Sequence, residues 1–191
     1  MAIKTFTSGE VLTASDTNTY LTNSGLVYVG QTIATSGTTF DINNCFSAAY
    51  DSYHVVLSDI RLAGAGSMTF QLMNGSTPSN SNYAWAFTRV AYDATTSING
   101  SGYPSYVSSW STSLTAGTTA SAFSMDIFNP YLAQYSYYQC NATDNRGVNG
   151  YGIQIGGGTH ASASSYSSLR FTITSTTITN ITATVYGYRK A

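Results

Sequence analysis

Charged side chains are scarce in this chain of 191 residues, because Asp, Glu, Lys and Arg together make up 8% of the sequence, against roughly 25% in a typical soluble domain. Hydrophobic residues make up 42%, which is enough for a core. The polar surface must therefore come from Ser, Thr, Asn, Gly and 16 Tyr residues, which form hydrogen bonds without carrying charge. Such a surface does little to repel further copies of the chain, so it suits a protein that works in an assembly.

Several partners and locations are excluded by what is missing. The net charge is −1 and the few Lys and Arg residues form no cluster, so we expect no binding to nucleic acid or to an anionic membrane. No apolar run approaches the roughly 18 residues of a membrane-spanning helix, and we expect no membrane insertion. The first residues lack the hydrophobic region of a secretory signal. We therefore expect a chain made in a cytoplasm and kept there, or exported as part of something larger.

Cysteine and histidine are rare as well, with two residues of each. The missing export signal favours a reduced, buried pair for Cys45 and Cys140, with a disulfide as the alternative. His54 lies in a predicted strand and is expected to be half-buried and hydrogen-bonded. His160 follows a run of three glycines in a predicted loop, without the strand-to-helix context of a phosphate site.

Acidic residues offer little for catalysis. Of the eight, Asp59 and Asp126 alone lie inside predicted strands, and Asp59 has Arg61 or Arg89 as a possible ion-pair partner. Cysteine and histidine spacings typical of zinc sites and the carboxylate rhythm of a calcium loop are both missing. We predict no catalytic residue, no metal ligand and no cofactor, and hence a protein that is not an enzyme.

Alternating apolar side chains predict β-strands along most of the chain after residue 25. Between Ser67 and Met73, for example, Met68, Phe70 and Leu72 are expected to point inward. The pattern predicts strands over residues 26–33, 53–62, 67–73, 83–87, 123–127, 169–173 and 179–188. Clusters of turn-forming residues lie between them, at 63–66, 74–78, 99–104 and 145–150. About eight to ten short strands with this spacing predict an all-β fold, a single β-sandwich or jelly-roll domain.

A short N-terminal arm precedes this body. Thr13 is a suitable helix N-cap, and Asp16 can return a hydrogen bond to its backbone. The segment Asn23-Ser-Gly25 ends a helix of at most about three turns, which needs something to pack on. We therefore divide the chain into an arm with one short helix, residues 1–25, and a β-sandwich body, residues 26–191.

Aromatic residues gather in the stretch 99–152, which is predicted to be irregular. Tyr together with Ser, Gly and Asn is the composition of recognition loops, where Tyr gives contact area at low entropic cost. The alternative is that many of these rings fill the core or an interface between subunits. The candidate contact residues are Tyr103, Tyr106, Trp110, Tyr131, Tyr135, Tyr137, Tyr138 and Tyr151.

The arm reads Phe6-Thr-Ser-Gly-Glu-Val-Leu-Thr-Ala-Ser-Asp-Thr-Asn-Thr-Tyr-Leu21. It resembles a segment that recurs in structural proteins of tailed bacteriophages, among them minor tail proteins, fibre-like proteins and small virion proteins. The last residues, Thr184-Val-Tyr-Gly-Tyr-Arg-Lys-Ala191, are similar to the C-termini of that group. The resemblance implies a β-sandwich located in the virion, often a homotrimer, tethered through its arm by the docking residues Phe6, Val11, Leu12, Asp16, Tyr20 and Leu21.

Three functional hypotheses follow. The first is a tail-fibre or tail-associated adhesion protein of the virion, with other virion proteins as partners and a host surface glycan as a further candidate partner. The second is a capsid decoration protein that stabilises the head shell. The third, from another class, is a glycan-degrading depolymerase, for which the chain offers no convincing acid–base pair.

Overall fold

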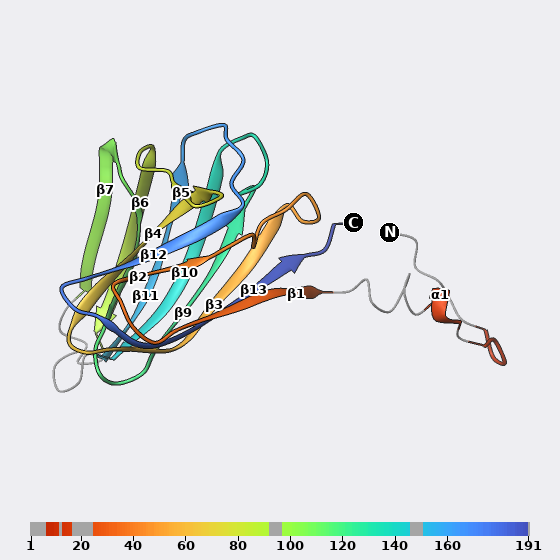
Figure 1. Cartoon of the computed structure of the whole chain (residues 1–191), viewed down its shortest axis with the longest axis horizontal. Coiled ribbons are helices and arrows are strands. Elements are labelled where there is room, and N and C mark those ends of the chain that lie inside the picture. The colour runs from red at the N-terminus through yellow and green to blue at the C-terminus, as the bar shows by residue number, and fades with distance from the viewer. Residues whose placement is uncertain (1–6, 12, 17–24, 92–96, 146–150, 191) are drawn as a thin grey trace.

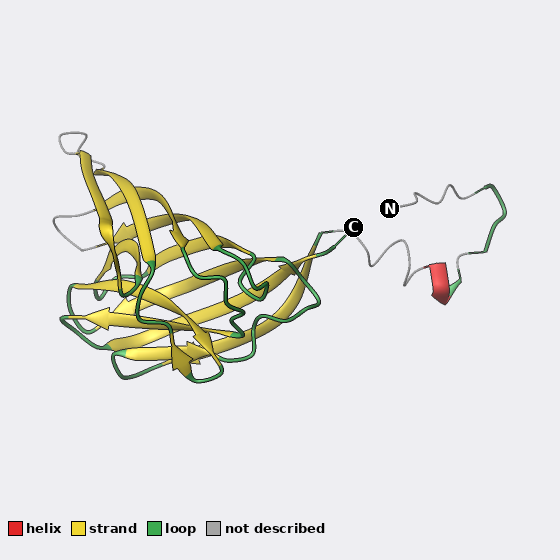
Figure 2. Cartoon of the chain, turned by 90° about the horizontal axis from the view of Figure 1, so that it is seen from above, coloured by secondary structure: helices red, strands yellow, loops and turns green. Residues whose placement is uncertain are grey.

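The structure is a computed structural model, and it describes residues 7–11, 13–16, 25–91, 97–145 and 151–190. The described part of the chain is all-β apart from one short helix, α1 (Ala14–Asp16). Two antiparallel sheets pack face to face in a β-sandwich (Figures 1 and 2). With three residues, α1 is far too short to cross a membrane, and the described residues contain no other helix that could do so.

The larger sheet has eight strands, in the order β1-β13-β3-β9-β10-β11-β6-β7. The smaller sheet has the order β2-β12-β4-β5, and β8 also pairs with β4. The strands are β1 (Leu26–Ala34), β2 (Thr39–Ile42), β3 (Ser52–Leu62), β4 (Gly66–Asn74), β5 (Thr77–Pro78), β6 (Tyr83–Ala91), β7 (Ser97–Val107), β8 (Trp110–Ala116), β9 (Ser121–Phe128), β10 (Ser136–Asn145), β11 (Tyr151–His160), β12 (Ser168–Thr174) and β13 (Ile178–Tyr188).

Eight of these strands form a jelly roll, which is a pair of four-stranded sheets connected as two Greek keys. Its first sheet is β1-β13-β3-β9, and its second is β2-β12-β4-β8. Two insertions enlarge the first sheet. The segment between β4 and β8 contributes β6 and β7, and the segment between β9 and β12 contributes β10 and β11. All four inserted strands lie beyond β9, so they form a continuous extension of one sheet (Figure 1).

The core lies between the sheets and is rich in aromatic rings. The ring centroid of Phe70 on β4 lies 5.0 Å from that of Tyr138 and 5.2 Å from that of Trp110. Phe171 on β12 and Phe123 on β9 complete this cluster. Aromatic pairs of this kind add about 0.5–1.5 kcal/mol each beyond the area that they bury. Tyr138 belongs to an inserted strand, so the extension is packed into the same core as the jelly roll.

The strands predicted from alternation are confirmed, including the inward direction of Met68, Phe70 and Leu72 on β4. Two expectations about residues 99–152 are wrong. The predicted turn at 99–104 lies within β7, and the stretch as a whole holds five strands, β7 to β11. Gly100 and Gly102 occur there because the rings of Phe87 and Trp85 on β6 occupy the space that a Cβ at either position would need. Pro104 is tolerated because β7 is the edge strand of the sheet.

The described part of the arm lies outside the sandwich. In both views α1 stands apart from the two sheets, beyond the start of β1 (Figures 1 and 2). Helix α1 begins directly after Thr13, in agreement with the predicted N-cap. Val11 exposes 78% of its surface. Of the other predicted docking residues, Phe6, Leu12, Tyr20 and Leu21 lie outside the described residues, as does the side chain of Asp16.

Candidate functional site

A groove lies on the outer face of the inserted strands and has a volume of about 880 Å³. We call it the outer groove. A smaller hollow continues it along β6, β7 and β11, and the two share Ala86, Ser101 and Gly157. The volume of the outer groove falls within the range of sites that hold small molecules, about 300–1,000 Å³. The outward-facing residues that line the groove are Ala86 and Thr88 on β6, Ser101 on β7, Gln139 and Asn141 on β10, and Ile155 and Gly157 on β11.

Small side chains on neighbouring strands create the floor of this groove. In the register of the sheet, Ser101, Ala86, Gly157 and Gln139 form one row across β7, β6, β11 and β10. A Cβ at Gly157 would lie 2.8 Å from the carbonyl oxygen of Tyr138, so the strands approach too closely at this point for a larger residue. The missing side chain leaves a depression between Ala86 and Gln139.

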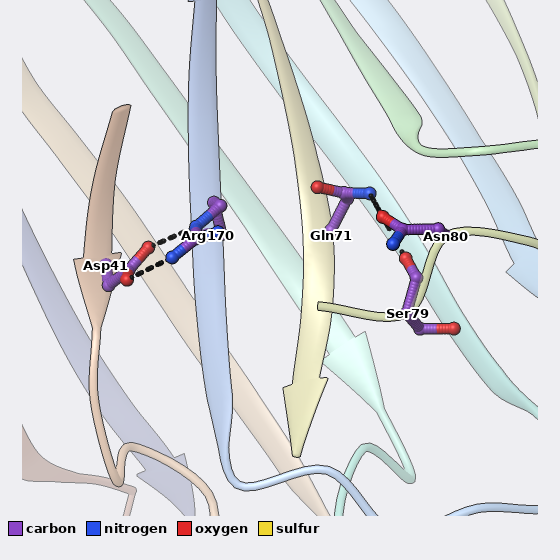
Figure 3. Close-up of polar contacts among 5 residues, drawn as sticks. All are labelled: Asp41, Gln71, Ser79, Asn80 and Arg170. Carbon is purple, nitrogen blue, oxygen red and sulfur yellow. Dashed lines mark hydrogen bonds and ion pairs between the residues drawn. The ribbon is translucent and has the colours of Figure 1, made fainter. Parts of the chain in front are cut away.

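Two amide side chains face the groove without a partner in the described part of the chain. Gln139 and Asn141 are exposed, and neither side chain forms a hydrogen bond with any other residue that the structure describes. Gln71, on the outer face of the smaller sheet, is different. Its Nε2 donates to the carbonyl oxygen of Ser79 and to Oδ1 of Asn80 (Figure 3). The same Nε2 also donates to the carbonyl oxygen of Ser108. Gln71 therefore stabilises the fold, whereas the amides of the groove remain available to a ligand.

No charged side chain lines the outer groove among the residues that the structure describes. Ion pairs lie elsewhere: Arg170 binds Asp41 through two hydrogen bonds of 2.7 Å on the smaller sheet (Figure 3), and Arg61 binds Asp59 at 2.6 Å on β3. The pairing of Asp59 with Arg61 was one of the two expected. The groove is thus electrically neutral over its described lining, and its polar groups are amides and hydroxyls.

Among the acids that the structure describes with their side chains, Asp126 is nearest to the groove in register, since it faces Gln139 across β9 and β10. Its Oδ1 lies 2.7 Å from Nδ1 of His54 and accepts a hydrogen bond of 2.6 Å from the hydroxyl of Tyr188. Partial burial, and then the hydrogen bond to this carboxylate and its charge, raise the pKa of Tyr188 to about 12. The prediction of a half-buried, hydrogen-bonded His54 is confirmed, and the contact fastens the end of β13 to the sheet.

The two acids considered for glycan cleavage lie far apart. His54 faces Asp126 in register, and Asp59 lies five positions further along β3. Five residues of a strand span about 16 Å, whereas paired catalytic carboxylates lie roughly 5–10 Å apart. No group of three or more His, Cys, Asp or Glu side chains in the described part of the chain could hold a metal ion.

His160 and the cysteines are buried. His160 ends strand β11 instead of lying in a loop, which corrects the expectation, and its Nε2 lies 3.0 Å from the hydroxyl of Ser79. Cys45 and Cys140 are buried and unbonded, as predicted, and burial raises the pKa of each thiol to about 12. A thiol with such a pKa is a poor nucleophile at neutral pH.

The predicted contact aromatics divide into three sets. Trp110 and Tyr138 are fully buried or nearly so, hence their assignment to a contact loop is wrong and they belong to the core. Tyr131, Tyr135 and Tyr137 expose between 36% and 49% of their surface. Tyr137 lies beside the groove, because it precedes Gln139 by two positions on the same face of β10 and pairs with Thr159. The side chains of Tyr103, Tyr106 and Tyr151, on β7 and β11, lie outside the described residues.

The polar groove residues, Gln139 and Asn141 above all, were missed in the sequence. A usable signal was present, since Tyr138, Cys140 and Ala142 alternate as the inward side of a strand and leave Tyr137, Gln139 and Asn141 on the outer side. Searches with family models, among curated proteins and among solved structures each found nothing that matches the chain.

Proposed function

We propose that the chain is a structural, non-enzymatic component of a tailed bacteriophage virion, docked by its N-terminal arm and acting in tail-associated adhesion. The observation that carries the proposal is the position of the arm outside a complete sandwich. Among the described residues, the hydrophobic core contains no side chain before Phe40, and the earliest residues that pack against it are Val29 and Ala34. A segment that the body does not use for its own core is free to bind another virion protein.

The body supports the same role through its surface. Its described charges are mostly paired within the chain, as in Asp41–Arg170, Asp59–Arg61 and Asp51–Lys190. The remaining outer face of the larger sheet presents hydroxyls, amides and scattered apolar side chains. Such a face makes contacts by shape and hydrogen bonding, which suits adhesion at the surface of a particle. The open groove favours adhesion over a purely cementing role on the capsid.

Deletion of residues 1–24 tests the docking role. Because β1 begins at Leu26 and the described core needs no earlier residue, the truncated chain should keep its β circular dichroism spectrum and its unfolding midpoint. The truncated chain should, however, be missing from purified particles when it is the only form of the protein produced during infection. Quantitative mass spectrometry of the particles measures this loss. A folded, truncated chain that still enters particles would contradict docking by the arm.

A matched pair of substitutions makes the test finer. Val11→Asp adds a charge to the exposed arm, and Thr118→Asp adds the same charge to an exposed loop of the body. We expect Val11→Asp to reduce incorporation several-fold and Thr118→Asp to leave it unchanged, with both proteins equally stable. Equal incorporation of the two variants would show that Val11 is not part of the docking surface.

A further inference from the structure

We propose that the outer groove binds an uncharged glycan chain, with the side-chain amides of Gln139 and Asn141 as its main hydrogen-bonding groups. This inference rests on the adhesive function proposed above and names the chemical class of its ligand. The glycan would lie across β10, β11 and β6, over the depression at Gly157.

Hydrogen bonding favours a glycan as the ligand of the groove. A primary amide offers two N–H donors and a carbonyl acceptor, and a sugar hydroxyl both donates and accepts. Gln139 and Asn141 point outward from alternate positions of β10, about 7 Å apart, a separation comparable with one sugar unit. Their exposed amides have no partner in the described part of the chain. Ser101, across the groove on β7, adds an exposed hydroxyl.

Apolar contacts in the groove favour the same ligand. A sugar ring carries C–H groups on its faces, and these pack against aliphatic and aromatic side chains. Ile155 stands opposite Asn141 on β11 and exposes 63% of its surface. Tyr137 exposes 43% at the end of the groove near Thr159. Polar and apolar groups are therefore interleaved, as recognition of a polyhydroxylated ring requires.

The charge of the groove favours a neutral ligand. An anionic polymer would lose hydration there without gaining a cationic partner among the residues that the structure describes. Arg89 on β6 is buried on the inner face of the sheet and points away from the groove. Arg61 and Arg170 form ion pairs with aspartates elsewhere. Neutral glycans are thus favoured over sulfated or uronic polymers and over nucleic acid.

The small side chains at the centre of the groove favour a glycan over a second protein chain. Protein interfaces derive most of their affinity from large aromatic and aliphatic anchors in desolvated pockets. The centre of the outer groove is formed by Ala86, Ser101 and Gly157, which offer little apolar area. A ligand rich in hydroxyl groups matches this floor better than an apolar protein surface does.

Binding of the full chain to immobilised neutral oligosaccharides of glucose, galactose, mannose and N-acetylglucosamine tests the proposal, with heparin and hyaluronan fragments as charged probes. We expect at least one neutral glycan to bind. Gln139→Ala and Asn141→Ala should each weaken binding about fivefold, the loss of one or two hydrogen bonds. Ala86→Trp, which fills the groove from an exposed position, should abolish it.

Gln31→Ala is the matched control. Gln31 is an exposed glutamine on β1, on the same face of the same sheet as the groove. In the register of that sheet, one row of paired residues runs from Gln31 through Thr184, Val56 and Ser124 to Asn141. This variant should bind as the unchanged protein does. The proposal is overturned if no neutral glycan binds at about 1 mM, if charged fragments alone bind, or if Ala86→Trp leaves binding intact. It is also overturned if Ala86→Trp dissociates an oligomer, because the groove is then an interface between copies.

Failure of this inference can be told apart from failure of the proposed function. Particle incorporation of the full chain without any glycan binding would overturn the ligand alone. Glycan binding by a chain that never enters particles would instead overturn the virion role and leave the binding site in place.

Discussion

At the scale of single residues, His160 shows how burial controls ionisation. Its ring has no exposed surface and lies among the rings of Tyr83, Trp110 and Tyr166, with centroids 4.3–6.1 Å away. Burial holds the pKa of His160 below its ordinary value of 6.5. The folded protein therefore keeps the ring neutral at a pH at which the unfolded chain has already bound a proton. The free energy of unfolding is therefore unaffected by His160 above pH 6.5, and it decreases as the pH falls below this value.

This linkage predicts a measurable slope. As the pH falls below about 6.5, His160 should lower the free energy of unfolding by at most about 1.4 kcal/mol per pH unit. His160→Gln, which cannot titrate, should lose that part of the pH dependence in urea unfolding experiments. His54→Gln, at a partly exposed histidine bound to Asp126, should keep the part of the pH dependence that is due to His160. A His160→Gln protein whose stability still falls by the full amount would show that other groups are responsible.

Tyr137 and Tyr138 are neighbours on β10 that face opposite sides of the sheet. Tyr138 is 2% exposed and donates a 2.7 Å hydrogen bond to the carbonyl oxygen of Ser111. Tyr138→Ala should therefore cost about 3–5 kcal/mol of unfolding free energy. Tyr137→Ala should change it by no more than about 0.5 kcal/mol. Urea denaturation of the two variants gives the comparison, and equal losses would mean that Tyr138 is not the core residue described above.

At the scale of elements, the glycine run of β11 determines how closely three strands approach. A Cβ at Gly158 would collide with the carbonyl oxygen of Ala84 on β6 and would lie 2.7 Å from Cε1 of Tyr138 on β10. Gly158→Ala should destabilise the protein by about 2–3 kcal/mol through overpacking. Gly30→Ala on β1 is the control, because nothing lies within 4 Å of the added Cβ. Thermal unfolding of both variants is the measurement, and similar midpoints would refute close packing at β11.

The same elements explain what could be predicted from the sequence. Strands β1, β3, β4, β9, β12 and β13 belong to the jelly roll and alternate clearly, because one face of each is buried, or in β1 partly buried, against the other sheet. Strand β11 was missed because its inward positions Gly156 and Gly158 carry no apolar side chain, and β7 was missed for the same reason at Gly100 and Gly102. Rings from neighbouring strands occupy the space at Gly100, Gly102 and Gly158, and backbone and side-chain atoms of β6 and β10 lie close to Gly156. A local sequence pattern does not show these neighbours.

The groove could not be predicted for a related reason. It depends on the register that aligns Ser101, Ala86, Gly157 and Gln139 across four strands from two separate insertions. Alternation gives the outward side of β10, but not its neighbours. Of the candidate contact aromatics, Tyr137 lies beside the groove, whereas Trp110 and Tyr138 are in the core.

At the scale of the whole molecule, we expect a homotrimer. Strand β1 is an edge of the larger sheet and exposes Leu26, Tyr28 and Ile33 without any charge, a surface that favours contact between copies. Analytical ultracentrifugation at micromolar concentration should show a species of three chains. Ile33→Lys should shift it towards monomer, whereas Ile155→Lys, at an equally exposed isoleucine of the same face, should not. A stable monomer of the unchanged protein would contradict this expectation.

The virion role itself is tested most directly by counting this chain in purified phage particles, with isotope-labelled peptides of the chain as mass-spectrometric standards. A tail-associated adhesion protein docked by its arm should be present in a small number of copies per particle, in multiples of three. Its absence from particles would contradict a structural role in the virion. Hundreds of copies would contradict the tail location and assign the chain to the capsid surface instead.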